Sequence, residues 1–286
     1  MMGIVILVVC IILFIAYGYC SNFILTKSIV QLSVRSGQEQ NAPTDKKQEI
    51  RFVLLADLHG ALFGKENKKL LLAVREERPD GIFIAGDMVV KNGKGVFETL
   101  SLCRELVKIC PVYYGLGNHE IRLTDREEFI DKLKKTGVIL LDNEITTASF
   151  YGKKVQIAGL TLSEEYYEKF WREKILAVQK LEKLFPQKRE RMPTILIAHN
   201  PEYFKTYAKW GADLVLSGHV HGGIMMLPFG GVISPSFRIF PKYTNGVYTE
   251  GSSKMVLSRG LGLHHIKLRF FNLPQIVTIV IPVEKL

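Results

Sequence analysis

Five short segments of the chain collect side chains that can bind metal ions. Imidazole nitrogen and carboxylate oxygen suit Mn, Fe, Zn and related ions, and no thiolate joins the set. Each segment directly follows an apolar run that predicts a strand, and ligands in open α/β sheets bind at the carboxyl ends of strands. The segments are therefore expected to meet at one edge. They are Asp57-Leu58-His59, Gly86-Asp87, Gly117-Asn118-His119-Glu120, His199-Asn200 and Gly218-His219-Val220-His221.

The spacing within these segments suits a site for two cations. Residues two apart on an extended backbone share a face, so Asp57 and His59 are expected to point the same way, as are His219 and His221. The glycine before Asp87 lets the backbone turn sharply and present a carboxylate, which can bridge two cations. Two cations about 3.5–4 Å apart can hold a hydroxide between them and clamp a phosphoryl group.

Each motif alone has a simpler explanation, and the combination carries the inference. A single buried histidine is usually a satisfied core residue, and Gly-Asp alone has almost no specificity. Gly-His-x-His after a strand is more specific, and five motifs in order at strand ends are hard to obtain by chance. Gly117 precedes Asn118, and we expect it to permit the same sharp turn as the glycine before Asp87.

A mixed α/β domain must position these segments. Strands and helices alternate in the first half of the chain and strands dominate later, which favours an α/β sandwich. Tyr166, Tyr167, Phe170 and Trp171 bunch at the start of the longest predicted helix, where core packing is the favoured use and a membrane-interface position the alternative. Strands are predicted at 50–56, 81–85, 111–114, 194–198, 214–216, 254–257 and 276–281, and helices at 65–77, 96–109, 126–135 and 164–183.

The first 26 residues carry no charge and predict a transmembrane anchor. Every residue from Ile4 to Tyr17 is apolar or aromatic, and the first charge is Lys27. At about 1.5 Å per residue this stretch spans roughly 39 Å as a helix, enough for a ~30 Å hydrocarbon core. A cleaved signal peptide is the alternative, but no Lys or Arg precedes the apolar run, and Tyr19 before Cys20 does not suit a lipoprotein cleavage site. The basic residues that follow favour a cytoplasmic catalytic domain.

Three parts are predicted: an anchor over 1–26, a polar linker over 27–49 and a catalytic domain over 50–286. A mixed hairpin that feeds the sheet is the alternative for the linker. The 286 residues are 47% hydrophobic and 23% charged, which excludes collagen-like and wholly disordered chains. Four cysteines are too few for a disulfide scaffold. The net charge of +10 favours anionic partners such as phosphates, anionic lipid or nucleic acid.

The order Asp-x-His, Gly-Asp, Gly-Asn-His-Glu, His and Gly-His-x-His resembles the calcineurin-like metallophosphoesterase superfamily over residues 50 to 282. The uncharged N-terminal segment, His221-Gly222-Gly223 and Ser258-Arg259-Gly260-Leu261-Gly262 are similar to its bacterial membrane-associated branch. The resemblance implies a four-layer fold, a β-sandwich flanked by helices. It also implies in-line hydrolysis of a phosphoester by a hydroxide that bridges two metal ions, with Mn, Fe or Zn as the expected cofactors.

The same resemblance implies roles for individual residues. His119 would contact the phosphoryl oxygen or protonate the leaving group, with Glu120 orienting it, since a neighbouring carboxylate raises a histidine pKa and fixes its tautomer. Glu120 stands where many members have Asp, and Val220 and Ile224 also depart from common residues at the expected rim. One metal ion would be held by Asp57, His59, His221 and shared Asp87, and the other by Asp87, Asn118, His199 and His219.

Other features have weaker explanations. Arg259 lies in a Gly-rich loop at the expected site edge, where binding the substrate phosphate and forming a structural salt bridge are equal alternatives. His264 and His265 are adjacent and would point to opposite faces of a strand, so we expect them in a loop or on the surface. The basic residues within 188–191 are expected to be a solvated helix end, because no stacking aromatics interleave with them.

The leading prediction is a membrane-anchored phosphohydrolase of the phosphodiesterase type. Its substrate would be a phosphoester or pyrophosphate, and the anchor and positive charge favour a lipid-linked one. The alternative is a non-catalytic metal-binding scaffold at the membrane, against which count His119 and seven retained candidate ligands. A nucleic-acid partner is not expected, because it would leave the five motifs unexplained. The sequence leaves open the metal identity, the ester class, the membrane side and the oligomeric state.

Overall fold

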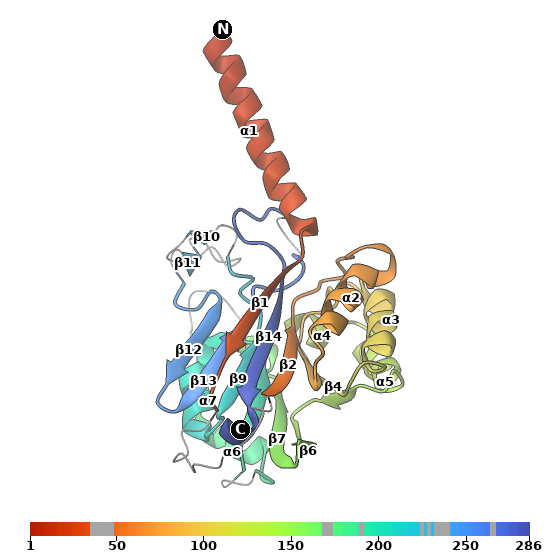
Figure 1. The fold of residues 1–286 in the computed structure, drawn as a ribbon, viewed down its shortest axis with the longest axis vertical. Coiled ribbons are helices and arrows are strands. Elements are labelled where there is room, and N and C mark those ends of the chain that lie inside the picture. Colours follow the sequence, from red (N-terminus) through yellow and green to blue (C-terminus); the bar gives the residue numbers. More distant parts are fainter. Residues whose placement is uncertain are drawn as a thin grey trace.

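Two six-stranded sheets pack face to face and carry helices on their outer faces (Figure 1). Phe52 and Phe83 of one sheet and Ile197 of the other meet in a central core, and two further cores lie beneath the helices. The predicted four-layer α/β sandwich is confirmed. This computed structural model describes residues 1–34, 49–167, 174–188, 192–223, 226–227, 230–231, 241–263 and 267–286.

The first sheet has the order β1-β14-β2-β3-β4-β5. β2 to β5 run parallel, β14 is antiparallel to β2, and β1 is parallel to β14. β3 is buried along its whole length, as an apolar strand covered on both faces must be. The strands are β1 (Thr26–Gln31), β2 (Glu49–Leu55), β3 (Gly81–Ala85), β4 (Val112–Gly115), β5 (Ile139–Leu141) and β14 (Gln275–Pro282).

The second sheet has the order β12-β13-β9-β8-β7-β6. β7, β8, β9 and β13 run parallel in its centre, and β6 and β12 are antiparallel edges. The strands are β6 (Glu144–Phe150), β7 (Lys153–Leu160), β8 (Thr194–Ala198), β9 (Leu214–Ser217), β12 (Gly246–Glu250) and β13 (Ser253–Leu257), with a small separate hairpin of β10 (Met226–Leu227) and β11 (Gly230–Gly231).

Amphipathic helices cover the outer faces of both sheets. α2, α3 and α5 bury apolar residues against the first sheet, for example Leu70 and Val74 of α2. α6 and α7 cover the second sheet with Leu181, Phe204 and Trp210. The helices are α1 (Met2–Cys20), α2 (Lys68–Glu76), α3 (Val96–Leu106), α4 (Asn118–Ile121), α5 (Arg126–Lys134), α6 (Val178–Leu184) and α7 (Phe204–Trp210), with 3-10 turns η1 (Ser21–Phe23), η2 (Lys65–Asn67), η3 (Glu164–Tyr166), η4 (Pro201–Tyr203) and η5 (Val283–Lys285).

The helix predicted over 164–183 is wrong. Residues 164–166 form only the 3-10 turn η3, residues 174–177 lie outside any helix, and α6 begins at Val178. Bulky aromatic residues bunch at the start of this stretch, and at 3.6 residues per turn they cannot all face one core. Phe170, Trp171, Arg189, Arg191, Ile224, His264 and His265 lie outside the described residues.

β1 lies within the segment for which a linker is predicted. Its residues alternate between half-buried and exposed, and Thr26 donates hydrogen bonds to the Pro274 carbonyl from both its backbone nitrogen and its hydroxyl. Lys27 pairs with Glu76 of α2 at 2.5 Å. Residues 26–31 therefore belong to the first sheet as a strand parallel to β14, which neither the linker nor the hairpin alternative describes.

α1 leaves the domain at the end where the ligand-bearing strands finish. Thr26 of β1 pairs with Gln275, and Leu54 of β2 pairs with Val277 two residues further on. The start of β1 and the carboxyl end of β2 are therefore level, and η1 joins α1 to β1 there (Figure 1). The stretch Met2–Phe23 is long and apolar enough to cross a membrane, and only 6% of its most apolar window is buried.

Candidate metal centre

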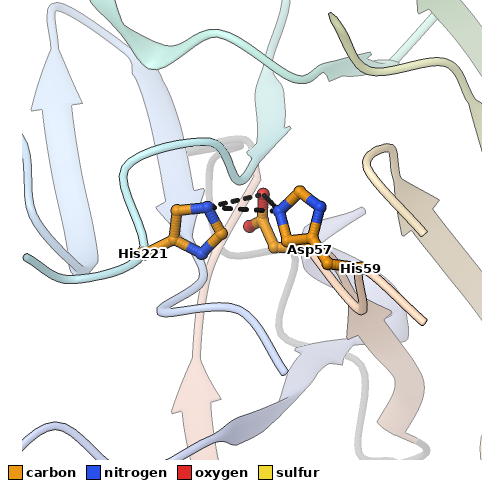
Figure 2. Close-up of side chains that lie close together, drawn as sticks. All are labelled: Asp57, His59 and His221. Atoms are coloured by element: carbon orange, nitrogen blue, oxygen red, sulfur yellow. Dashed lines mark hydrogen bonds and ion pairs between the residues drawn. The ribbon is translucent and has the colours of Figure 1, made fainter. Parts of the chain in front are cut away.

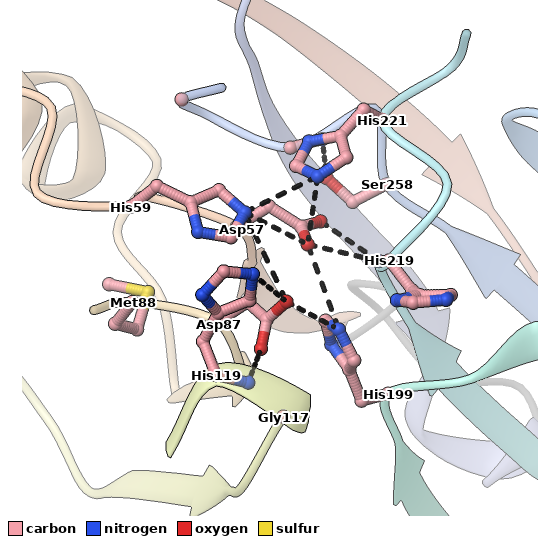
Figure 3. A network of polar contacts seen from close by, with 12 residues as sticks. Asp57, His59, Asp87, Met88, Gly117, His119, His199, His219, His221 and Ser258 are labelled. Carbon is pink, nitrogen blue, oxygen red and sulfur yellow. Dashed lines mark hydrogen bonds and ion pairs between the residues drawn. The ribbon is translucent and has the colours of Figure 1, made fainter. Parts of the chain in front are cut away.

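The five segments come together at the carboxyl ends of strands from both sheets (Figure 3). Asp57 follows β2, Asp87 follows β3, Asn118 follows β4, His199 follows β8 and His219 follows β9. The parallel strands of each sheet point their carboxyl ends the same way, and the packing of the two sheets brings both sets of loops together. The structure therefore confirms the expected convergence of the five segments.

Asp57, His59 and His221 form the first group of ligand atoms. Their candidate ligand atoms all lie within 4.8 Å of one another, and all three residues are buried. Asp57 Oδ1 lies 4.0 Å from His59 Nε2 and 3.9 Å from His221 Nε2, and the two Nε2 atoms are 3.3 Å apart (Figure 2). One cation could contact all three side chains.

Asp87 belongs to two further groups and lies between the first group and the second. It forms one group with His199 and His219, and another with His59 and His119. Asp87 Oδ2 is 3.0 Å from His199 Nε2 and 4.0 Å from both His59 Nε2 and His119 Nε2 (Figure 3). This carboxylate is placed to be shared by two cations.

Asn118, at the start of α4, offers a buried amide oxygen. Its side chain is 5% exposed, and its Oδ1 atom is buried and accepts no hydrogen bond from the described residues. A buried carbonyl oxygen without a donor is costly in a protein that binds nothing there, whereas a cation would satisfy it. Six of the seven candidate ligands thus form two adjacent groups of imidazole and carboxylate atoms, and Asn118 adds a buried amide oxygen; these residue types fit two metal ions.

Left-handed backbone conformations aim the ligands. Asp57, His59, Asp87, His219 and His221 have φ of 54°, 47°, 54°, 77° and 52°. The expectation that the Asp57 and His221 segments are extended is therefore wrong, because alternation along a strand does not apply past its end. Non-glycine residues in this region cost of order 1–3 kcal/mol each, and such strain collects at functional sites.

Hydrogen bonds fix the orientation of the ligand side chains. The backbone N–H of His219 donates to both carboxylate oxygens of Asp57, at 3.0 and 3.1 Å. His199 Nδ1 lies 2.6 Å from the Ala85 carbonyl and His59 Nδ1 3.3 Å from the Val89 carbonyl, so each Nδ1 can donate there. That arrangement leaves the Nε2 lone pairs directed at the centre, as in most histidine–metal sites.

The buried charges of the site depend on one another. Burial raises the pKa of Asp57 to about 7. Burial would also raise the pKa of Asp87, but the adjacent His199 holds it well below its usual range. Burial lowers the pKa of His199, yet the carboxylates of Asp87 and Asp57 outweigh it and raise the value to about 9. The two buried carboxylates thus favour a proton on His199 in the metal-free protein, and a bound cation would take the place of this proton.

Comparison with known proteins places this site in a family. The sequence model described as calcineurin-like phosphoesterase matches residues 50–223, which contain all seven candidate ligands together with His119 and Glu120. The chain belongs to this family. It is a metal-dependent phosphoester hydrolase, and the family uses a dinuclear metal centre.

Several bacterial relatives of this phosphoesterase are similar over most of its length. The metallophosphoesterase YkuE of Bacillus subtilis is 29% identical over 217 residues, 73% of this chain and 70% of the relative. Phosphodiesterase YaeI of Escherichia coli is 25% identical over 225 residues, 76% of this chain and 77% of the relative. A metallophosphoesterase of Helicobacter pylori is 28% identical over 227 residues, and the chain spans only 57% of its length.

Glu120 of the phosphoesterase binds groups other than the His119 ring. Its carboxylate accepts hydrogen bonds from the backbone N–H groups of Asp87, Met88 and Gly117 at 2.8, 2.7 and 3.0 Å, and from the Tyr114 hydroxyl at 2.9 Å. Glu120 thus braces the loops after β3 and β4. The expectation that Glu120 orients His119 stays a prediction.

A backbone N–H group contacts the His119 ring. Its Nδ1 accepts a hydrogen bond from the Lys91 N–H at 3.0 Å, which places the proton of the neutral ring on Nε2. Its own backbone N–H donates to Asp87 Oδ1 at 2.8 Å. The side chain is 4% exposed and takes part in the Asp87 group. His119 therefore presents an N–H donor at the edge of the metal centre.

Two glycines allow the metal-binding loops of the phosphoesterase to approach closely. A Cβ atom at Gly117 would lie 2.2 Å from Asp87 Oδ1, and one at Gly218 would lie 2.6 Å from Asp57 Oδ2. Gly117 has φ of −100°, which any residue can adopt. The sharp turn expected there is not the reason for glycine, which is instead the space taken by the Asp87 carboxylate.

Arg259 lies half-buried beside Gly222, next to the His221 loop. Among the described residues no carboxylate pairs with it, and its Nε atom is buried without a hydrogen-bond partner. Burial lowers its pKa. The salt-bridge alternative has no support in the described part of the chain. Val220, expected at the rim, is 7% exposed and packs in the core beneath α7.

Asn272 and Arg269, two buried residues that the sequence did not indicate, bind backbone carbonyls next to the first ligand group. Asn272 Nδ2 donates to the His221 carbonyl at 2.7 Å and to the Gly223 carbonyl. The Arg269 guanidinium donates to the carbonyls of Gly262 at 2.9 Å, Asn272 at 3.1 Å and Gly260 at 3.3 Å. Both side chains are fully buried. No motif marks either residue, because they act on carbonyls that any sequence supplies.

Proposed function

We propose that this phosphoesterase is a membrane-anchored dinuclear phosphodiesterase. The observation that carries the proposal is the position of Asp87 Oδ2, within 4.0 Å of imidazole nitrogens from both ligand groups. Asp57, His59, His221 and Asp87 would hold one metal ion, and Asp87, Asn118, His199 and His219 the other. Two bound cations would supply an activated water near neutral pH and neutralise charge on the phosphoryl group.

The protein's own side chains would complete the reaction. His119 offers its Nε2 proton to the oxygen that leaves, because Nδ1 is occupied by the Lys91 N–H. Arg259 would hold a phosphoryl oxygen with a guanidinium that has no carboxylate partner among the described residues, and a planar guanidinium suits this role. The hydrogen bonds from Arg269 and Asn272 to backbone carbonyls would hold the loop of His221 in place when the ester binds.

A diester is the proposed substrate class, and a lipid-linked ester is the proposed form. The name of the Escherichia coli relative, a phosphodiesterase, supports the first. The second is supported by the exit of α1 at the end of the sheet where Asp57 lies. The net charge of +10 also favours a surface that carries anionic lipid.

Contacts at the base of α1 support the proposed anchor over 1–26. Phe14 stacks on Phe270 with ring centroids 4.3 Å apart, and the Arg269 N–H donates to the Gly18 carbonyl at 2.9 Å. Tyr17 lies 5.8 Å from the ring of Phe271, which is 60% exposed. Aromatic side chains at a helix end suit the membrane–water boundary. The anchor would then hold the catalytic domain, over 50–286, with its metal centre toward the bilayer.

Metal analysis and two model esters test the catalytic proposal. The full chain, purified in detergent without chelator, should carry about two metal ions per chain. With added Mn²⁺ it should cleave bis-p-nitrophenyl phosphate faster than p-nitrophenyl phosphate. His119→Ala should keep both metal ions and lose about 10²- to 10⁴-fold in kcat. Faster cleavage of the monoester by the wild type would overturn the diesterase assignment.

Protease protection tests the membrane proposal and its orientation. The basic residues after the first 26 favour a cytoplasmic catalytic domain. The chain should sediment with membranes after an alkaline wash, and external protease should cleave it only after the inner membrane is opened. Release of the intact domain by the wash would contradict the anchor, and cleavage in spheroplasts would reverse the orientation.

A further inference from the structure

We propose that Tyr167 is a further catalytic residue, whose hydroxyl donates a hydrogen bond to the phosphoryl group of the bound ester. The proposal depends on phosphoester binding at the metal centre and not on the diester or lipid assignments. Tyr167 directly follows η3 and lies in none of the five metal-binding segments. Its surroundings place it on the second ligand group.

The ring of Tyr167 packs against two metal-ligand candidates at once. Its centroid is 5.2 Å from that of His219, edge to face at 69°, and 6.1 Å from that of His199. His219 is half-exposed, whereas Asp87 and His199 are buried. Tyr167 therefore borders the side of the second group from which an ester can approach.

The backbone around Tyr167 is fixed to the loop that carries His199. The Tyr166 carbonyl accepts a hydrogen bond from Asn200 Nδ2 at 2.9 Å and another from the Tyr203 hydroxyl at 3.2 Å. The Asn200 carbonyl in turn accepts from the Tyr207 hydroxyl at 2.9 Å. A residue held this way cannot move from His199 without breaking these partly buried hydrogen bonds, so its position is preorganised.

An ion pair fixes the same turn to the other side of the site. Glu164 of η3 lies 3.3 Å from Arg122, which directly follows α4. α4 carries both Asn118 and His119. The turn before Tyr167 thus contacts both the β8 loop of the second sheet and the residue after α4, which follows β4 of the first sheet.

The hydroxyl of Tyr167 differs from those of its tyrosine neighbours. The Tyr166 hydroxyl accepts from Lys180 Nζ at 3.3 Å, and the Tyr203 and Tyr207 hydroxyls donate to backbone carbonyls. The backbone N–H of Tyr167 donates to the Glu164 carbonyl at 2.8 Å, but its hydroxyl forms no hydrogen bond with the described residues. A phenol hydroxyl beside His199 and His219 is a donor suited to an anionic oxygen, as in oxyanion sites.

A single-atom change in the full chain tests the role. Tyr167→Phe removes the hydroxyl and keeps the ring against His219, and Tyr166→Phe is the matched control, because its hydroxyl contacts Lys180 instead. Removing a donor to a charged group should lower kcat/KM on bis-p-nitrophenyl phosphate by about 10- to 100-fold. Tyr166→Phe should stay near wild type, and both variants should bind Mn²⁺ like wild type.

Binding of inorganic phosphate to the Mn²⁺-loaded chain gives a readout independent of turnover. Calorimetry should show about 10-fold or weaker phosphate binding for Tyr167→Phe than for wild type and Tyr166→Phe. Unchanged phosphate affinity would overturn the proposal, and so would loss of Mn²⁺, because the hydroxyl would then act through the metal site. A wild type inactive on both esters would refute the proposed function, while phosphate binding would still decide the role of Tyr167.

Discussion

Replacing Asn272 with alanine should loosen the first metal group without touching any ligand. The substitution removes two hydrogen bonds to the backbone after β9, one to the carbonyl of His221 at 2.7 Å and one to that of Gly223. Both carbonyls would lose a buried donor, at about 1–2 kcal/mol each, so unfolding should become easier by about 2–4 kcal/mol. For a domain of this size that corresponds to a fall of about 5–15 °C in Tm.

The effect on metal binding separates a positioning role from a purely structural one. Groups that orient metal ligands are typically worth about 10- to 100-fold in affinity. Calorimetric titration of Mn²⁺ into the metal-free full chain should therefore show this loss at one of two sites. Asn92→Ala, which removes only an exposed bond to the Lys94 N–H, should change neither Tm nor affinity. A lower Tm with both Mn²⁺ affinities intact would refute the reasoning.

Three further predictions concern the same centre. Gly117→Ala should abolish binding of at least one metal ion, measured by metal analysis, because its Cβ would lie 2.2 Å from Asp87 Oδ1. Glu120→Gln should lower the free energy of unfolding by about 1–3 kcal/mol in denaturant titrations, because an amide cannot accept all four hydrogen bonds; unchanged stability would contradict this. The rise in Tm caused by Mn²⁺ should grow from about pH 6 to about pH 9, since a cation must displace protons from Asp57 and His199. Burial raises the pKa of Asp57 to about 7. The neighbouring carboxylates outweigh burial and raise the pKa of His199 to about 9. The protons on these two groups therefore stabilise the metal-free fold at low pH, and this stabilisation is lost as the pH rises through the pKa of each group in the folded protein.

The sequence predicts the ligand set because strand ends are visible in it. Wholly apolar runs such as 81–85 and 194–198 become buried parallel strands, and the polar residues after them lie at the carboxyl edge. What the runs do not show is how the chain turns after each strand. Asp57 and His221 adopt left-handed backbone because loops from two sheets must converge, and that constraint is not local in sequence.

The contributions of Tyr167, Arg269 and Asn272 could not be predicted for a related reason. Each contacts residues distant in sequence, as Asn272 contacts His221 across 51 positions. The pattern from residue 164 onward predicts a helix, yet Glu164–Tyr166 form the turn η3. Periodicity detects a face packed on a core, and a short turn held by side-chain hydrogen bonds has no period to detect.

The position of β14 between β1 and β2 governs the order in which the protein can be built on the ribosome. β1 and β2 emerge early, but they have no direct contact in the first sheet, since β14 pairs with both. Until residues 275–282 are synthesised, one edge of β2 has no strand to pair with, and most of its side chains are apolar ones that are buried in the folded protein. Such an edge can pair with strands of other chains. Nascent chains will therefore depend on protection of that edge, and truncation before residue 275 should yield aggregates rather than a smaller enzyme.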